Sequence, residues 1–198
     1  MSANRVARRW RLFRRDTQGV AAIEFAMALP IMVVAYCGTV DVVQMVMANR
    51  KVSQLRLALA DLTAQFAPIA TTDLDNIFNA AQMVLQPFDS ANVSMVISSV
   101  VIDANGAAKV CWSSARNGTA LARGATVTLP DSVRVPSTSV IMARAAYTYT
   151  PMIGYVLTGS FTLGNDPIYT RPRSGQALGT ASIEQIARTG TNPCPSFS

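Results

Sequence analysis

The chain has 198 residues, of which 50% are hydrophobic and 14% are charged, and its formal net charge at pH 7 is +6. This charged fraction is well below the roughly 25% typical of soluble domains. The composition therefore excludes a disordered chain and indicates a membrane segment. The chain contains no histidine, which excludes catalytic triads and metal sites that depend on histidine.

Positive charge is concentrated at the amino-terminal end. Residues 1–19 contain six arginines and one acidic residue, Asp16. A protein that binds nucleic acid normally carries its basic patch on the folded domain. A short basic tail before an apolar segment is instead typical of a membrane protein whose amino terminus stays in the cytoplasm. We therefore predict a basic cytoplasmic leader at 1–19 and no nucleic-acid partner.

An apolar segment follows this tail. Residues 25–40 carry no charge, and the apolar character extends over 20–47 with Glu24 and Asp41 as the interruptions. At about 1.5 Å per residue, a helix over 20–47 is longer than the roughly 30 Å hydrocarbon core of a bilayer. The sequence predicts a single transmembrane helix at 20–47, provided that the two carboxylates find partners.

The junction between leader and helix carries a processing pattern. Gly19 is followed by four apolar residues, then by Glu24 and Phe25. With the basic leader before it, the segment GVAAIEFAMALP resembles the start of the TadE/TadG-like pseudopilins of tight-adherence (Tad) pilus systems. The resemblance implies that a prepilin peptidase cuts between Gly19 and Val20. It also implies that Glu24, Phe25 and Pro30 serve recognition and assembly.

The position of Glu24 also has a physical meaning of its own. Cleavage would leave a positive amino group on Val20, one helical turn from Glu24. A carboxylate at the centre of a membrane helix costs on the order of 2.5–3.5 kcal/mol, so it should find a cation. The resemblance to pilins implies that this cation is the new amino group, its own or a neighbour's. The alternative is that Glu24 lies hydrated at the cytoplasmic interface.

Beyond the apolar segment the pattern becomes periodic. Apolar residues recur at alternating spacings of three and four, which predicts a helix with a narrow apolar seam. We expect one helix over 20–65, about 70 Å long, whose extension at 48–66 is amphipathic and which ends before Pro68. The seam packs either on the chain's own outer domain or on partner helices. Its residues are Met45, Ala48, Val52, Leu55, Leu59, Leu62 and Phe66.

Residues 67–190 predict a small periplasmic α+β domain, followed by a tail at 191–198. Thr72 and Asp75 indicate the start of a second helix, which Pro87 ends. The period then changes to that of strands, predicted at 93–102, 108–113, 139–150 and 160–170. The expected fold is a long transmembrane helix that continues into a domain with an antiparallel sheet, similar to type IV pilins.

Cys111 and Cys194 both lie in the predicted outer domain. The periplasm is oxidising, so we expect a disulfide that ties the tail to the strand at 108–113, with two free thiols as the alternative. Cys37 lies within the predicted membrane helix, where it is expected to be a small apolar residue.

The sequence has no phosphate-binding loop, dinucleotide-binding motif, nucleophile elbow or metal cluster. We expect no enzyme activity and no cofactor. The resemblance implies a minor pseudopilin, a structural component of Tad/Flp-type pilus biogenesis in the bacterial inner membrane, with its carboxyl-terminal domain in the periplasm. The implied partners are the prepilin peptidase, the inner-membrane platform proteins, other pilins and membrane lipid. The alternative is a single-pass membrane-anchored periplasmic binding module whose amino terminus is not cleaved.

Overall fold

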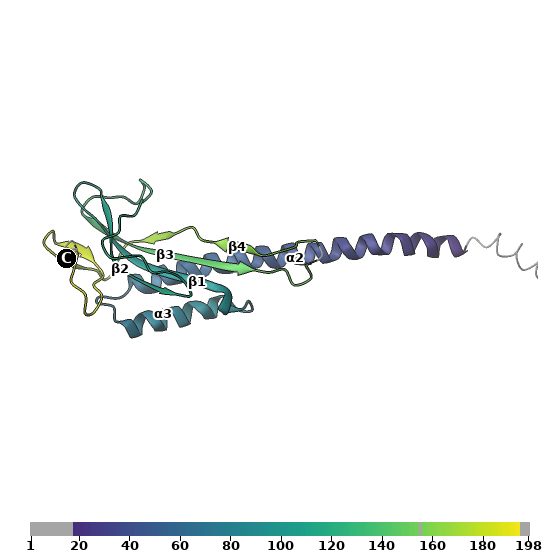
Figure 1. Cartoon of the computed structure of the whole chain (residues 1–198), viewed down its shortest axis with the longest axis horizontal. Coiled ribbons are helices and arrows are strands. Elements are labelled where there is room, and N and C mark those ends of the chain that lie inside the picture. The colour runs from purple at the N-terminus through teal and green to yellow at the C-terminus, as the bar shows by residue number, and fades with distance from the viewer. Residues whose placement is uncertain (1–17, 155, 195–198) are drawn as a thin grey trace, which may run out of the picture. The chain divides into compact units, whose positions relative to one another are not determined.

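The structure, a computed structural model, describes residues 18–154 and 156–194 (Figure 1). The predicted leader therefore lies outside the described residues, except for Gln18 and Gly19. The chain divides into two compact units. The first unit joins Met1–Gln44 to Pro151–Gly159, and the second joins Met45–Thr150 to Ser160–Ser198.

The helix α2 spans Gln18–Ala64 and continues through Pro30. Its bounds confirm the predicted long helix to within two residues at either end. Proline has no backbone N–H, so one helical hydrogen bond is missing at Pro30. The helix ends before the residue that precedes Pro68, as expected where a following proline disfavours the helical conformation.

The second unit contains an antiparallel sheet, which confirms the α+β prediction. Its strands are β1 (Val93–Ile102), β2 (Ala108–Arg116), β3 (Thr138–Tyr149), β4 (Phe161–Gly164) and β5 (Ile168–Thr170). The strand order is β2-β1-β3-β4, and β5 also pairs with β3. The turn between β1 and β2 is stabilised by the Asp103 carboxylate, which accepts hydrogen bonds from the backbone N–H groups of Asn105 (2.9 Å) and Ala107 (2.8 Å).

The two faces of the sheet are covered differently. One face packs on α2 and on α3 (Thr71–Val84), which both lie along the strands in Figure 1. The other face is covered by the connection between β2 and β3 and carries a smaller apolar cluster. Alternate residues of β1 supply the two clusters, as the pleat of a strand requires. Val93, Met95 and Ile97 face the helices, whereas Val100 and Ile102 face the connection.

The start of α3 differs from the prediction. The helix begins at Thr71, and the carboxylate of Asp73 accepts a hydrogen bond from the backbone N–H of Ala70 at 2.9 Å. The predicted pair, Thr72 and Asp75, therefore lies inside the first turns. Asp73 sits three residues after the capping position, where an acidic side chain can reach back to the free N–H.

The last strands also differ from the prediction. The single strand expected at 160–170 is divided into β4 and β5, because the backbone turns at Gly164 (φ +84°) and Asn165 (φ +79°). A two-stranded hairpin of β6 (Gln176–Leu178) and β7 (Ile183–Gln185) was not predicted. Each of its strands has only three residues, too few for a recognisable alternation.

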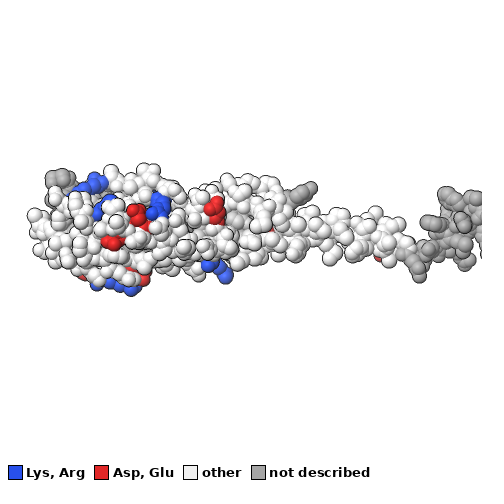
Figure 2. All heavy atoms as spheres, turned by 90° about the horizontal axis from the view of Figure 1, so that it is seen from below, with Lys and Arg blue, Asp and Glu red and all other residues white. Residues whose placement is uncertain are grey.

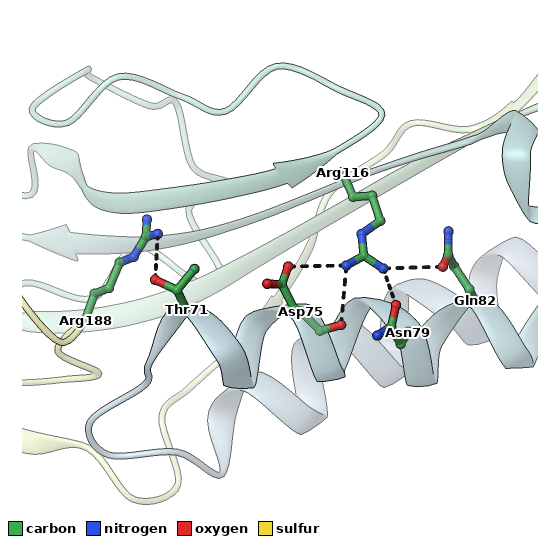
Figure 3. A network of polar contacts seen from close by, with 6 residues as sticks. All are labelled: Thr71, Asp75, Asn79, Gln82, Arg116 and Arg188. Atoms are coloured by element: carbon green, nitrogen blue, oxygen red, sulfur yellow. Dashed lines mark hydrogen bonds and ion pairs between the residues drawn. The ribbon is translucent and has the colours of Figure 1, made fainter.

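Polar contacts attach α3 to the rest of the second unit (Figure 3). At the end of β2, Arg116 donates hydrogen bonds to the side chains of Asn79 (2.5 Å) and Asp75 (3.2 Å). Arg188 reaches the hydroxyl of Thr71 at 3.4 Å. These contacts are partly exposed, so they orient the helix while its buried face supplies most of the stability.

Candidate membrane and assembly site

The residues predicted for processing and assembly all lie in the first part of α2, between Gly19 and Pro30. Gly19 is the second residue of the helix, and a Cβ added to it would meet nothing within 4 Å. Val20, Glu24, Phe25 and Pro30 are all exposed, with 62% of Phe25 accessible. Among the described residues, none covers this end of the helix, which leaves it accessible to a processing enzyme or to a partner helix.

Glu24 has no ion pair within residues 18–154 and 156–194. A single turn of helix separates it from Val20, whose backbone nitrogen is an amide in the uncleaved chain. The geometry thus places an acidic side chain at the right spacing for a new amino group. No observation on the described residues tests that pairing, and it stays a prediction.

The first unit exposes an apolar helix surface. α2 contains a segment with a mean hydropathy of 2.1 that is long and apolar enough to cross a membrane, and none of that segment is buried. Large side chains such as Met27 (72%) and Ile31 (73%) are accessible to solvent. Figure 2 shows this part of α2, toward the right of the view, almost without Lys, Arg, Asp or Glu. An uncovered apolar surface of this size requires a lipid or protein environment.

Asp41, the second acidic residue of the apolar segment, is fully buried. Its carboxylate oxygens accept hydrogen bonds from the backbone N–H groups of Ile153 and Gly154, both at 3.2 Å. These residues belong to the connection between β3 and β4, which is part of the same unit. A buried carboxylate is costly without such donors, so this connection provides part of what Asp41 needs.

The amphipathic seam of α2 is occupied by the chain's own second unit. Ala48, Val52, Leu55 and Leu59 have no accessible surface and belong to the core shared with α3 and the sheet. Met45, Leu62 and Phe66 are partly buried against the same core. Of the two interpretations left open by the sequence, packing on the outer domain is the one observed. A partner helix would have to bind another face of α2.

Two further contacts fix α2 against the sheet. Gly164, at the end of β4, approaches the helix so closely that an added Cβ would lie 2.7 Å from a Val52 methyl and 2.6 Å from the Ala145 carbonyl oxygen. Arg56 is also largely buried and donates a hydrogen bond to the backbone carbonyl of Asp166 at 2.6 Å. Gly164 thus allows the β4–β5 turn to approach α2 closely, and Arg56 fixes the turn there with a hydrogen bond.

Cys111 and Cys194 form a disulfide, as predicted. In the pairing of β1 with β2, Ser99 lies opposite Trp112 and Val100 opposite Val110, so Cys111 is the extra residue of a β-bulge. The buried side chain of Gln185 binds the other end, because it accepts from the Cys194 N–H (3.0 Å) and donates to the Cys194 carbonyl (2.7 Å). The predicted tail is therefore pinned as far as residue 194, where the description ends.

Residues 19–55 match the family model described as TadE-like protein. The match begins at Gly19, covers the exposed apolar segment of α2 and ends within the buried seam. It confirms the resemblance to TadE-like proteins over these residues. No curated protein and no solved structure matches the chain.

Sequence reasoning missed two sets of polar contacts, those that satisfy Asp41 and those that Gln185 makes with Cys194. The sequence showed that the Asp41 carboxylate needs hydrogen-bond donors, but it did not show which. The backbone donors lie 112 and 113 residues further along the chain. The uncharged connection at 151–159 was a usable signal, because an apolar loop between two strands needs a cover. Gln185 carried no signal, since nothing in its neighbourhood marks a short buried hairpin.

Proposed function

We propose that this chain is a minor pseudopilin, a non-enzymatic structural component of Tad/Flp-type pilus biogenesis. It inserts into the bacterial inner membrane with its amino terminus in the cytoplasm and its second unit in the periplasm. A prepilin peptidase cuts between Gly19 and Val20. The inner-membrane platform proteins and sister pilins then contact the apolar part of α2.

The observation that carries this proposal is the position of the Gly19–Glu24 pattern. It lies at the start of a fully exposed apolar helix, and the TadE-like match begins at the same glycine. A peptidase that acts at a membrane surface needs an accessible bond, and no described residue approaches Gly19. A glycine at this position also allows close approach of the enzyme to the backbone.

The division of α2 supports a structural role in assembly. The seam of the helix is packed inside the second unit, which includes α2 from Met45 onward, and so is not available to a partner helix. The apolar segment before it remains uncovered and offers lateral contacts to other membrane helices. The new amino group on Val20, facing Glu24 of the same or a neighbouring subunit, would set the register of those contacts.

The mature amino terminus tests the proposal. The full chain is produced in cells with and without an active prepilin peptidase, and the terminal peptide is identified by mass spectrometry. We expect Val20 as the first residue when the peptidase is active and the uncleaved leader when it is absent or when Gly19 is replaced in Gly19→Leu. A leader retained in the presence of active peptidase contradicts the proposal and favours the alternative, a membrane-anchored periplasmic binding module.

A second variant separates processing from assembly. Glu24→Gln is expected to be cleaved but to lose most of its recovery with pilus components after mild crosslinking. Glu184→Gln, on the exposed position of β7, is the matched control and should assemble normally. Unchanged recovery of Glu24→Gln would show that the carboxylate does not serve assembly.

A further inference from the structure

The connection between β3 and β4, residues 151–159, is folded against α2 within the first unit. We call it the docked loop. Its backbone is fixed by Asp41, whose two carboxylate oxygens accept the N–H groups of Ile153 and Gly154. Gly38, one turn before Asp41, is also buried, and a Cβ there would lie 3.1–3.3 Å from the side chain of Val156. The helix therefore presents a glycine and an acceptor where the loop lies.

The docked loop exposes three large apolar side chains among its described residues. Met152 is 84% accessible, and Ile153 and Val156 are about half accessible. No residue from 151 to 159 is charged. A loop in water normally exposes polar residues, so this composition indicates an apolar environment.

The surface beside the loop has the same character. A shallow groove of about 430 Å³ is lined by α2 residues between Val34 and Val43 and by Val156. Its one hydroxyl, that of Thr39, donates to the backbone carbonyl of Ala35 at 2.8 Å and so needs no external partner. The described residues of the groove therefore offer hydrocarbon contacts and no free hydrogen-bonding group for a polar ligand.

The position of this groove along α2 places it at one edge of the hydrocarbon core of a membrane. A helix needs about 20 residues to cross the hydrocarbon core, so a span that starts near Val20 reaches the far edge of the core close to residue 40. The residues that touch the docked loop lie at that edge. The exposed apolar surface of α2 runs without interruption into the groove, so the lipid that surrounds the helix also surrounds the loop.

We propose that the docked loop is a lipid-contacting element. The side chains of Met152, Ile153 and Val156 enter the edge of the leaflet that surrounds residues 34–43. Asp41 makes this possible, because irregular backbone and a carboxylate are each unfavourable in lipid unless their hydrogen-bonding groups are satisfied. Two of the loop's N–H groups and the carboxylate satisfy one another.

The test uses the full chain in phosphatidylcholine vesicles with spin-labelled acyl chains. In a Cys37→Ser background, which removes the one free cysteine of the described residues, Met152→Cys carries an environment-sensitive fluorophore. Met83→Cys, at a 68% exposed position of α3, is the control. We expect lipid quenching at least threefold stronger at position 152 than at 83, and the reverse order for aqueous iodide.

Equal lipid quenching at the two positions would overturn the proposal. So would protection of position 152 from both quenchers, the result expected if a second copy of the chain covers the loop. Asp41→Ala should lower lipid quenching at 152 at least twofold, whereas Asp41→Asn, which keeps one carbonyl acceptor, should lower it less. Retention of the Cys111–Cys194 disulfide checks the fold, and unchanged quenching in folded Asp41→Ala would overturn the role of Asp41.

Discussion

The two halves of α2 are equally helical but have opposite surroundings. From residue 20 to 36 every side chain is exposed, whereas from residue 48 to 64 one stripe of the helix is fully buried. Apart from Glu24, the first half is apolar on all sides, and the second half is apolar only along a seam. The difference teaches that periodicity, not apolar content, determines whether a helix segment is covered by its own chain.

Loss of the disulfide should cause the largest decrease in the stability of the second unit, which contains the buried half of α2. The bond closes a loop with a sequence separation of 83, and crosslinks of such loops stabilise by about 4 kcal/mol. The double variant Cys111→Ala/Cys194→Ala should lower the free energy of unfolding of the second unit by about this amount. Hydrogen exchange should rise in residues 48–64 and stay unchanged in 20–36 of the micelle-bound protein. Equal changes in both segments would contradict the division of α2.

Truncation of the seam should have the next largest effect. Leu55 is fully buried, and Leu55→Ala should lower the free energy of unfolding by about 2–5 kcal/mol through lost burial and a cavity. Val33 is 50% exposed on the other half of α2. Val33→Ala is the matched control and should change it by less than about 0.5 kcal/mol. Denaturant titration in mild detergent measures both.

The close approach of β4 to α2 can be tested with two glycines. Gly164 and Gly159 both have a positive φ, but only a Cβ at Gly164 meets other atoms. Gly159→Ala should cost about 1 kcal/mol for its backbone conformation. Gly164→Ala should cost about 1–3 kcal/mol more, because Val52 and the sheet must shift. Similar losses of unfolding free energy in the two variants would show that α2 moves at Val52 to accommodate the new methyl group.

The smallest expected effect is a pH dependence of the stability of the second unit. Burial raises the pKa of Tyr147 above its usual 10.0, and the charges of Asp89 and Tyr149 raise it further. The unfolded chain therefore loses this proton first, so the stabilisation is complete below pH 10 and declines as the pH rises beyond it. The unfolding midpoint of Tyr147→Phe should fall less between pH 9 and 11 than that of the unchanged protein.

The sequence predicted most of the elements because their patterns are local. The helix bounds, β1 and the seam of α2 follow from runs of ten or more residues with a clear period. The cap of α3 lies two positions before the predicted one, at Ala70 and Asp73, because either of the acidic residues Asp73 and Asp75 can serve such a start. The division of β4 from β5 depends on the turn of the backbone at Gly164 and Asn165, which the strand pattern of 160–170 does not reveal.

Of the predicted site, the disulfide is confirmed, whereas the processing and assembly residues stay a prediction. The Gly19–Glu24 spacing and the cysteine pair can be read from residue type and context. The environment of Asp41 depends on two backbone groups more than 100 residues away, and backbone donors have no sequence signature. The choice between own domain and partner helix for the seam required the packed structure.

The strand order of the sheet affects the order in which the chain can fold during synthesis. β3 joins β1 to β4 and β5, yet it follows α2 by more than 70 residues. A chain that emerges with its amino end first displays the seam of α2 long before its central strand is available. α3 and the β1–β2 hairpin are the first segments that can shelter it. During synthesis this seam is consequently the surface with the longest opportunity for mispairing or for engagement by a chaperone.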